Sequence, residues 1–144
     1  MSKAPVNRES EQAISDIQSE MKRAWAARDA NRICAIYQGI GEDFLLFDLY
    51  QPFEDVGMKR AVEKTENFLE LTEGPVFVEY GDQRMFSSAD LVVVRSRCQF
   101  NFTMKGQTKK TEILCRSTMV FQLIQGVWTC VHQHDSLPNK DVDI

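Results

Sequence analysis

The spacing of hydrophobic residues changes about halfway along the chain. Before Pro75, apolar residues recur every three or four positions, as they do on one face of an α-helix. After Pro75, apolar and polar residues alternate, as they do along a β-strand. Helices followed by a run of long strands predict the α+β class, with the helices on one face of a mainly antiparallel sheet.

The part of the chain before Pro75 predicts three helices and one short strand. Ser10 can cap a helix that continues to about Arg28, and Asp29 can cap a second, short helix. The remaining segments read as a short buried strand, a loop and a third helix, over residues 44–47, 48–57 and 58–71.

The part that follows predicts four strands joined by short turns that contain Ser or Gly. These strands cover residues 76–85, 90–104, 111–124 and 127–135. We therefore expect a flexible N-terminus over residues 1–9, one domain over residues 10–138 and a short tail over residues 139–144.

Alternation divides each predicted strand into two faces. In the second strand Arg95 and Arg97 oppose Cys98, and in the third Arg116 and Thr118 oppose Cys115. An arginine in a strand centre is costly if it is buried without a partner, so Arg95 and Arg116 should either line a polar pocket or reach water. In the last strand, one face carries Trp128, Cys130, His132 and His134, and the other carries Val131, Gln133 and Asp135.

Composition narrows the classes of function. The chain has 144 residues, of which 43% are hydrophobic and 26% charged, with a net charge of −4. These values are typical of a globular protein, and an acidic balance argues against a nucleic-acid partner. No apolar run reaches the roughly 18 residues that a membrane span needs. The polar N-terminus lacks the core of a signal peptide. We therefore expect a cytoplasmic protein without a membrane partner.

Neither a metal nor another cofactor is expected. The four cysteines are widely spaced and lie in apolar contexts, which favours reduced, buried side chains. The pair His132 and His134 could serve as acid/base groups or metal ligands, but no third ligand follows at a useful spacing. A structural role, with hydrogen bonds across the sheet or a subunit interface, is the simpler interpretation of this pair.

The closing run from Gly126 to Pro138, with its initial Trp, two alternating His and terminal Ser-Leu-Pro, resembles the last strand of the nuclear transport factor 2-like superfamily, particularly its SnoaL-like branch. Three further segments fit that pattern: Trp25 to Asp29, Asp48 with Gly57 nine residues later, and Arg116 to Thr118. The resemblance implies a cone-shaped α+β barrel, in which a curved antiparallel sheet wraps around N-terminal helices. It also implies a homodimer packed through the outer sheet face.

Two members of the superfamily suggest roles for single residues. Ketosteroid isomerase keeps its general-base Asp where this chain has Asp48, but the positions of its oxyanion hole hold Met21 and Thr118. Steroid isomerisation by that mechanism is therefore not expected. The association domain of calcium/calmodulin-dependent protein kinase II is similar around Arg95 and around residues 132–136. Both resemblances imply that Arg95, Thr118, Gln133 and Asp135 face the pocket, and that His132 and His134 face outward unless a bulge shifts the register.

The leading interpretation is a pocket for a small organic molecule, with an anion among the candidates. If the chain is an enzyme, a cofactor-free acid/base isomerase, cyclase or hydrolase fits best, and an exposed Asp48 would contradict it. The alternatives are a non-catalytic homodimerisation or interaction module, and an epoxide hydrolase of the limonene type that uses Asp48, Arg95 and Asp135. The candidate catalytic residues are Asp48 and Asp135, and the candidate ligand-binding residues are Trp25, Tyr50, Arg95, Arg116, Thr118 and Gln133.

Overall fold

The computed structural model describes residues 8–39, 45–48 and 54–138. Within these residues the chain forms three α-helices, one 3-10 turn and six strands. The helical elements are α1 (Arg8–Ala26), α2 (Ala30–Cys34), η1 (Ala35–Tyr37) and α3 (Met58–Glu70). The strands are β1 (Leu45–Phe47), β2 (Glu54–Val56), β3 (Thr72–Ser87), β4 (Leu91–Met104), β5 (Lys110–Ile124) and β6 (Val127–Ser136).

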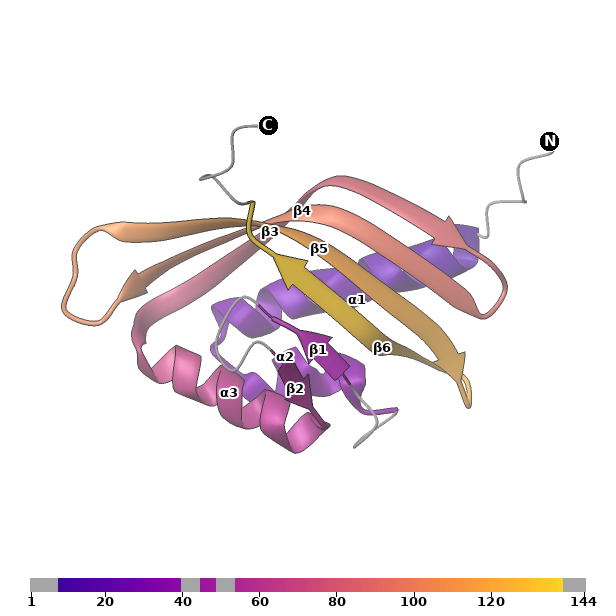
Figure 1. Cartoon of the computed structure of the whole chain (residues 1–144), viewed down its shortest axis with the longest axis horizontal. Helices are drawn as coiled ribbons and strands as arrows, with labels where there is room; N and C mark the ends of the chain where they lie inside the picture. The colour runs from indigo at the N-terminus through magenta and orange to yellow at the C-terminus, as the bar shows by residue number, and fades with distance from the viewer. Residues whose placement is uncertain (1–7, 40–44, 49–53, 139–144) are drawn as a thin grey trace.

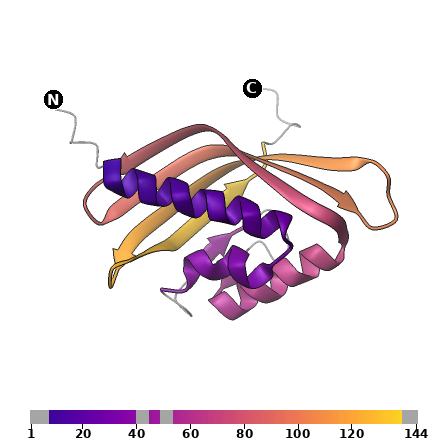
Figure 2. The same cartoon turned by 180° about the vertical axis from the view of Figure 1, so that it is seen from behind.

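The six strands form one curved sheet in the order β2-β1-β6-β5-β4-β3. Strand β1 pairs with β6 in parallel, and the other neighbouring strands pair in antiparallel fashion. The three helices lie on one side of the sheet, as Figures 1 and 2 show from opposite directions. The α+β class and a curved sheet around N-terminal helices are therefore confirmed. No helix in the described part of the chain is long and apolar enough to cross a membrane.

Two local predictions differ from the structure. The segment from Asp48 to Gly57 was expected to be a loop, but residues 54–56 form β2 against β1. Ser10 was expected to cap the first helix, but α1 already begins at Arg8, so Ser10 is a buried residue inside the helix. The capping role of Asp29 is confirmed, because its carboxylate accepts a hydrogen bond from the backbone N–H of Arg32 at 3.1 Å.

The inner face of the sheet, which the helices cover, carries the main hydrophobic core. From α1, Ile14, Met21 and Ala24 point into it at helical spacing, and Met119 and Phe121 meet them from β5. Arg28 adopts a left-handed backbone at φ 58°, and its guanidinium donates to the backbone oxygens of Leu69, Thr72 and Gly74. This side chain therefore links the end of α1 to the turn between α3 and β3.

A bulge in β6 exchanges the two faces of this strand. Val120 pairs with His132, but Phe121 pairs with Cys130, so Val131 is an extra residue in β6. Because paired residues share a face, Trp128 and Cys130 lie on the inner face, and so do Gln133 and Asp135 beyond the bulge. The prediction that Trp128 and Cys130 share a face with the two histidines was therefore wrong.

Candidate functional site

A cavity of about 510 Å³ lies between the inner face of the sheet and the three helices. Most of its wall is apolar or aromatic. Trp25 from α1 makes edge-to-face contacts with Phe68 of α3, at 6.0 Å between ring centroids, and with Phe100 of β4, at 5.6 Å. Phe68 contacts Phe102 in the same way at 5.1 Å. A cavity of this size and lining can enclose a small organic molecule.

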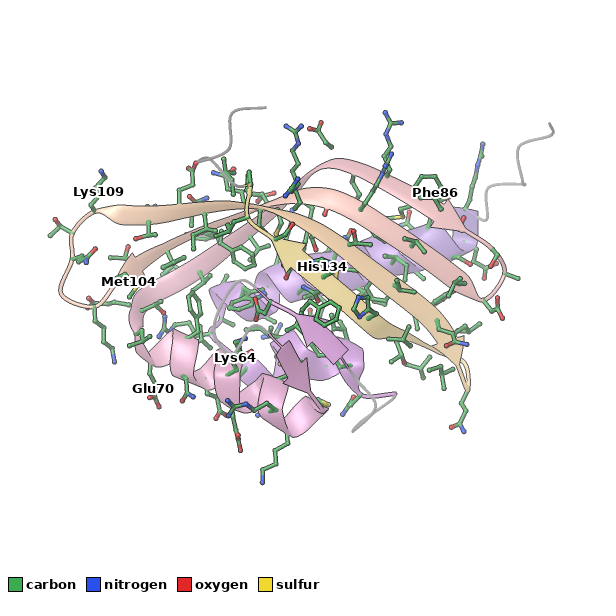
Figure 3. All side chains as sticks on the ribbon, in the orientation of Figure 1. Lys64, Glu70, Phe86, Met104, Lys109 and His134 are labelled. Atoms are coloured by element: carbon green, nitrogen blue, oxygen red, sulfur yellow. The ribbon has the colours of Figure 1, made fainter. Side chains whose placement is uncertain are left out.

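One carboxylate of the cavity belongs to Asp48, which directly follows β1. Because strand residues alternate, Asp48 points to the same side as the buried Leu46, away from Phe47. Its Oδ2 lies 3.1 Å from Nζ of Lys64 on α3, and the two side chains are only 16% and 13% exposed. In Figure 3, Lys64 lies on α3 beneath the sheet. Asp48 is thus a mostly buried member of an ion pair.

A second carboxylate, that of Asp135, ends a chain of hydrogen bonds. The hydroxyl of Tyr37 donates to Oε1 of Gln133 at 2.6 Å, and Nε2 of Gln133 donates to Oδ2 of Asp135 at 2.8 Å. The other carboxylate oxygen, Oδ1, is buried and has no hydrogen-bond partner among the described residues. Since each member is oriented by the one before it, the chain fixes the Asp135 carboxylate while leaving one oxygen open to a ligand.

Burial raises the pKa of Asp135 from 3.8 to about 6. The negative charge of Asp48 raises this pKa further, while the neighbouring Ser117 hydroxyl, the Gln133 amide and His134 lower it in part. Burial also raises the pKa of the Tyr37 hydroxyl well above its usual value, so Tyr37 remains a neutral donor. A carboxyl group with a pKa of about 6 can accept and return a proton near neutral pH.

Four of the residues predicted from the sequence meet at the cavity. Its wall includes Trp25, Asp48, Gln133 and Asp135. Tyr50 lies outside the described residues. The cavity thus combines a large apolar surface with a few polar groups from β5, β6, η1, α3 and the residue that follows β1.

Three predicted residues lie on the opposite, outer face of the sheet. Arg95, Arg116 and Thr118 are exposed there, and Arg95 pairs with Thr118 across β4 and β5. The guanidinium of Arg95 lies 5.4 Å from the centre of the Phe86 ring. Their expected place in the pocket was wrong, because alternation sorts residues into faces without telling which face the helices cover. The sheet also separates Arg95 from Asp48 and Asp135. These three residues therefore cannot act together as in an epoxide hydrolase of the limonene type.

The two histidines also lie on the outer face, as the resemblance implied. The rings of His132 and His134 contact the Phe47 ring edge-to-face, at 5.3 and 5.5 Å between centroids. Figure 3 labels His134 on β6 beside β1. These contacts give the pair a packing role between β1 and β6. The described residues contain no group of three His, Cys, Asp or Glu side chains that could hold a metal ion.

All four cysteines are free and buried, as the sequence predicted. Cys98 and Cys115 are directly opposed on β4 and β5. A hydrogen bond with Cys115, together with burial, raises the pKa of the Cys98 thiol far above its usual value. Burial likewise raises the pKa of Cys130. The thiols of Cys98 and Cys130 are therefore protonated and poor nucleophiles.

Sequence reasoning missed three polar residues of the site: Tyr37, Lys64 and Ser117. Tyr37 follows the second predicted helix and was given no chemical role. Lys64 lies between Ala61 and Phe68, two residues of α3 that also line the cavity, and this helical spacing was the available signal. Ser117 is the register partner of Asp135, so only the pairing of β5 with β6 reveals it.

The described architecture, an open curved sheet over helices that encloses an apolar cavity, defines a nuclear transport factor 2-like protein. More specifically, the model of the SnoaL-like domain matches residues 14–140, and the chain belongs to this family. No curated protein sequence matches the chain at a significant level.

Solved structures share this fold at low sequence identity. A nuclear transport factor 2-like protein of unknown function from Pseudomonas putida KT2440 is 20% identical, with a TM-score of 0.79 over 94% of this chain and 92% of that one. A putative scytalone dehydratase from Novosphingobium aromaticivorans is 13% identical, with a TM-score of 0.79 over 96% and 91%. A type 2 hexachlorocyclohexane dehydrochlorinase is 18% identical, with a TM-score of 0.75 over 92% and 87%.

Proposed function

We propose that the chain binds a small, largely apolar organic molecule in the cavity, and that Asp135 accepts and returns a proton on it without a cofactor. The observation that carries this proposal is the buried, unpartnered Oδ1 of Asp135, on a carboxyl group whose pKa is raised to about 6. A buried polar atom without a partner is rare in proteins, and a ligand is one reason for it.

In this mechanism the Tyr37–Gln133 pair orients the base, and the apolar wall excludes water. A C–H or O–H group of the ligand gives its proton to Oδ1, and the electron pair left behind forms a new bond or expels a leaving group. The ammonium group of Lys64, already beside Asp48 at 3.1 Å, lines the same cavity and can stabilise negative charge that develops on the ligand. The names of two relatives, a dehydratase and a dehydrochlorinase, describe the loss of water or hydrogen chloride, which fits removal of a proton by such a base.

The charge of the ligand follows from the groups on the cavity wall. The arginines that suggested an anion, Arg95 and Arg116, lie on the other face of the sheet. Among the described residues, the cations on the cavity wall are Lys64, which is paired with Asp48, and Arg60, whose side chain is half exposed. We therefore include in the proposal that the ligand is neutral and carries a polar group at one end.

A general probe of carboxylate bases tests this function without knowledge of the natural ligand. A carboxylate removes the ring C–H proton of 5-nitrobenzisoxazole, the ring N–O bond breaks, and the coloured nitrophenolate carries the charge. We expect the protein to accelerate this reaction, and kcat/KM to rise with pH around a midpoint of about 6, because the ionised form of Asp135 is the base.

The substitution Asp135→Asn should lower kcat/KM by about 10²-fold or more, because Asn cannot accept the proton. Asp48→Asn is the comparison variant: it should keep a pH-dependent rate whose midpoint moves to lower pH, because the charge of Asp48 raises the pKa of Asp135. Equal rates for wild type and Asp135→Asn would refute the assignment. Quenching of Trp25 fluorescence by the same probe reports binding separately from chemistry, since Trp25 lines the cavity.

The second candidate function is a homodimerisation or interaction module that uses the outer face of the sheet. Large apolar side chains are exposed on that face, among them Phe77 at 45%, Phe86 at 58% and Leu114 at 56%. In Figure 3, Phe86 lies on the upper side of the sheet. Exposed apolar side chains gathered on a sheet face with no helix over it, among the described residues, favour a protein partner. The two functions use opposite faces and are compatible.

A further inference from the structure

Tyr80 carries a hydroxyl group that the chemistry proposed for the cavity does not use. This residue lies on β3 and pairs with the buried Cys98 of β4, so its side chain projects from the inner face of the sheet and lines the cavity. The hydroxyl reaches α1, where it donates to Sδ of Met21 at 3.9 Å. Tyr80 is thus a polar residue at the β3 end of the cavity, whereas Asp135 lies on β6.

The protein itself satisfies this hydroxyl poorly. A thioether is a weak acceptor, and 3.9 Å is a long separation even for a hydrogen bond to sulfur. Burial raises the pKa of the Tyr80 hydroxyl well above its usual value, and Cys98 and Asp135 raise it further, so the group remains a neutral donor. A phenylalanine, such as the neighbouring Phe100, would fill the space without burying a hydroxyl. The hydroxyl of Tyr80 can therefore donate to a molecule in the cavity.

The surroundings of the hydroxyl select the kind of group that it can bind. Trp25, Cys98 and Phe100 belong to the same packed cluster as Tyr80, and all of them line the cavity together with Met21. The indole of Trp25 only donates, and the sulfur atoms of Met21 and Cys98 are weak acceptors. A ligand hydroxyl beside these described residues would leave its own hydrogen without a strong acceptor, whereas a carbonyl oxygen has no hydrogen to satisfy.

We propose that Tyr80 donates a hydrogen bond to a carbonyl oxygen of the ligand, at the opposite end of the cavity from Asp135. Strands β5 and β4 lie between β6 and β3, so three strand spacings separate the backbones of the two residues by at most about 14 Å across the curved sheet. Both side chains project into the space between them, where the aromatic wall contacts the apolar body of the ligand. The ligand class that follows is a neutral carbonyl compound.

This inference rests on the proposed binding of a ligand in the cavity, but it does not depend on proton transfer by Asp135. It identifies the polar group of the ligand as a carbonyl and places this group beside β3 instead of beside Lys64. Tyr80 is therefore a residue that determines specificity. Ligands of the same shape that lack the carbonyl oxygen would leave the Tyr80 hydroxyl with the thioether of Met21 as its acceptor.

A ketone and a hydrocarbon of the same shape test the role of Tyr80. In 2-acetylnaphthalene an aromatic body carries a carbonyl group, and in 2-isopropenylnaphthalene a CH₂ group replaces the oxygen. We expect Tyr80→Phe to weaken binding of the ketone about fivefold or more, which is the effect of one hydrogen bond, and to change binding of the hydrocarbon less than about twofold. Quenching of Trp25 fluorescence measures both affinities, since Trp25 lines the cavity.

Infrared spectroscopy of the bound ketone separates a hydrogen bond from a change of cavity shape. Donation to the carbonyl oxygen weakens the C=O bond, so the stretching frequency should be lower with wild type than with Tyr80→Phe. Tyr37→Phe is the matched comparison: it removes a hydroxyl that already donates to Gln133, and it should leave the frequency unchanged. A frequency with wild type equal to that in an apolar solvent would refute the hydrogen bond without the use of any variant.

Three further results would overturn the proposal: equal effects of Tyr80→Phe on the two probes, a frequency that changes in Lys64→Gln but not in Tyr80→Phe, or a wild-type chain that binds neither probe. The nitrobenzisoxazole reaction reports separately on Asp135. If Asp135→Asn leaves that reaction unchanged while Tyr80→Phe selectively weakens binding of the ketone, the proposed proton transfer fails and the role of Tyr80 stands. The reverse combination would remove Tyr80 from the site and retain the base.

Discussion

At the scale of single residues, two carboxylates share one cavity but have different surroundings. Asp48 is paired with the ammonium group of Lys64, whereas Asp135 receives a neutral amide donor and keeps one oxygen without a partner. An opposite charge compensates a buried carboxylate, and a neutral donor does so less well. The raised pKa of Asp135 follows from this contrast together with its burial. A site with one paired and one poorly compensated carboxylate can hold the first in place while the second exchanges protons.

The raised pKa of Asp135 makes the stability of the fold depend on pH. With a pKa of about 6 when folded and 3.8 as the model value, the folded chain holds the proton more tightly than the unfolded chain does. The stabilising effect of this proton is fully present below about pH 3.8 and is lost as the pH rises through about 6. Two pKa units correspond to about 3 kcal/mol.

Asp135→Asn should therefore become more stable relative to wild type as the pH rises. We expect the difference in the free energy of unfolding between variant and wild type to increase by about 3 kcal/mol from pH 3.5 to pH 8. Urea denaturation of both proteins at several pH values measures this difference. A difference that stays constant with pH, within about 0.5 kcal/mol, would mean that Asp135 titrates normally in the fold.

At the scale of elements, periodicity predicted most helices and strands but could not assign the faces of the sheet. The long helices and strands were found within a few residues of their ends, because each has a continuous apolar pattern. Strand β2 was missed, since a three-residue edge strand has too few positions to show alternation. The face of Arg95 and Arg116 was misassigned because both faces of β4 and β5 carry apolar residues. The bulge at Val131 has no local sequence signal and depends on pairing with β5.

The packing of β5 against the helices changes sharply toward its end. Phe121 is completely buried, whereas Leu123, two positions further on the same side of the strand, is 37% exposed. Phe121→Ala should therefore lower the free energy of unfolding by about 3–5 kcal/mol, since a large cavity would remain. Leu123→Ala is the matched control and should cost less than about 1.5 kcal/mol, because that side chain is already in contact with water. Similar losses for the two variants would show that the helices also cover the strand end.

At the scale of the whole molecule, the class of fold was predictable, but the pairing of distant segments was not. Helices followed by strands specify α+β, and the residues of the closing strand suggested the family. The parallel pairing of β1 with β6 joins segments more than eighty residues apart, and local pattern carries no information about such contacts. The cavity depends on this pairing, because Asp48 and Asp135 come close only when β1 lies beside β6. Asp48, Gln133 and Asp135 were predicted as site residues from the resemblance, but their meeting in one cavity became visible only in three dimensions.

The exposed apolar side chains of the outer face predict self-association. If two copies pack through this face, sedimentation velocity at rising concentration should show a dimer, and Phe86→Ser should weaken it at least tenfold. Val127→Ser is the control, because Val127 is 61% exposed but lies at the turn between β5 and β6. A wild-type chain that remains monomeric at all concentrations, or equal weakening by both variants, would contradict a dimer through the outer face.

The extra residue in β6 also has an evolutionary consequence. Substitutions change which side chain occupies a position, but they leave each position on its side of the sheet. Loss of the bulge by pairing of Val131 with Val120 would shift the rest of β6 by one position along β5. The imidazoles of His132 and His134 would then turn toward the cavity, and the carboxylate of Asp135 would turn away from it. A relative whose β6 pairs with β5 without the bulge could thus exchange a carboxylate base for an imidazole one, while it keeps the same strands and the same enclosed volume.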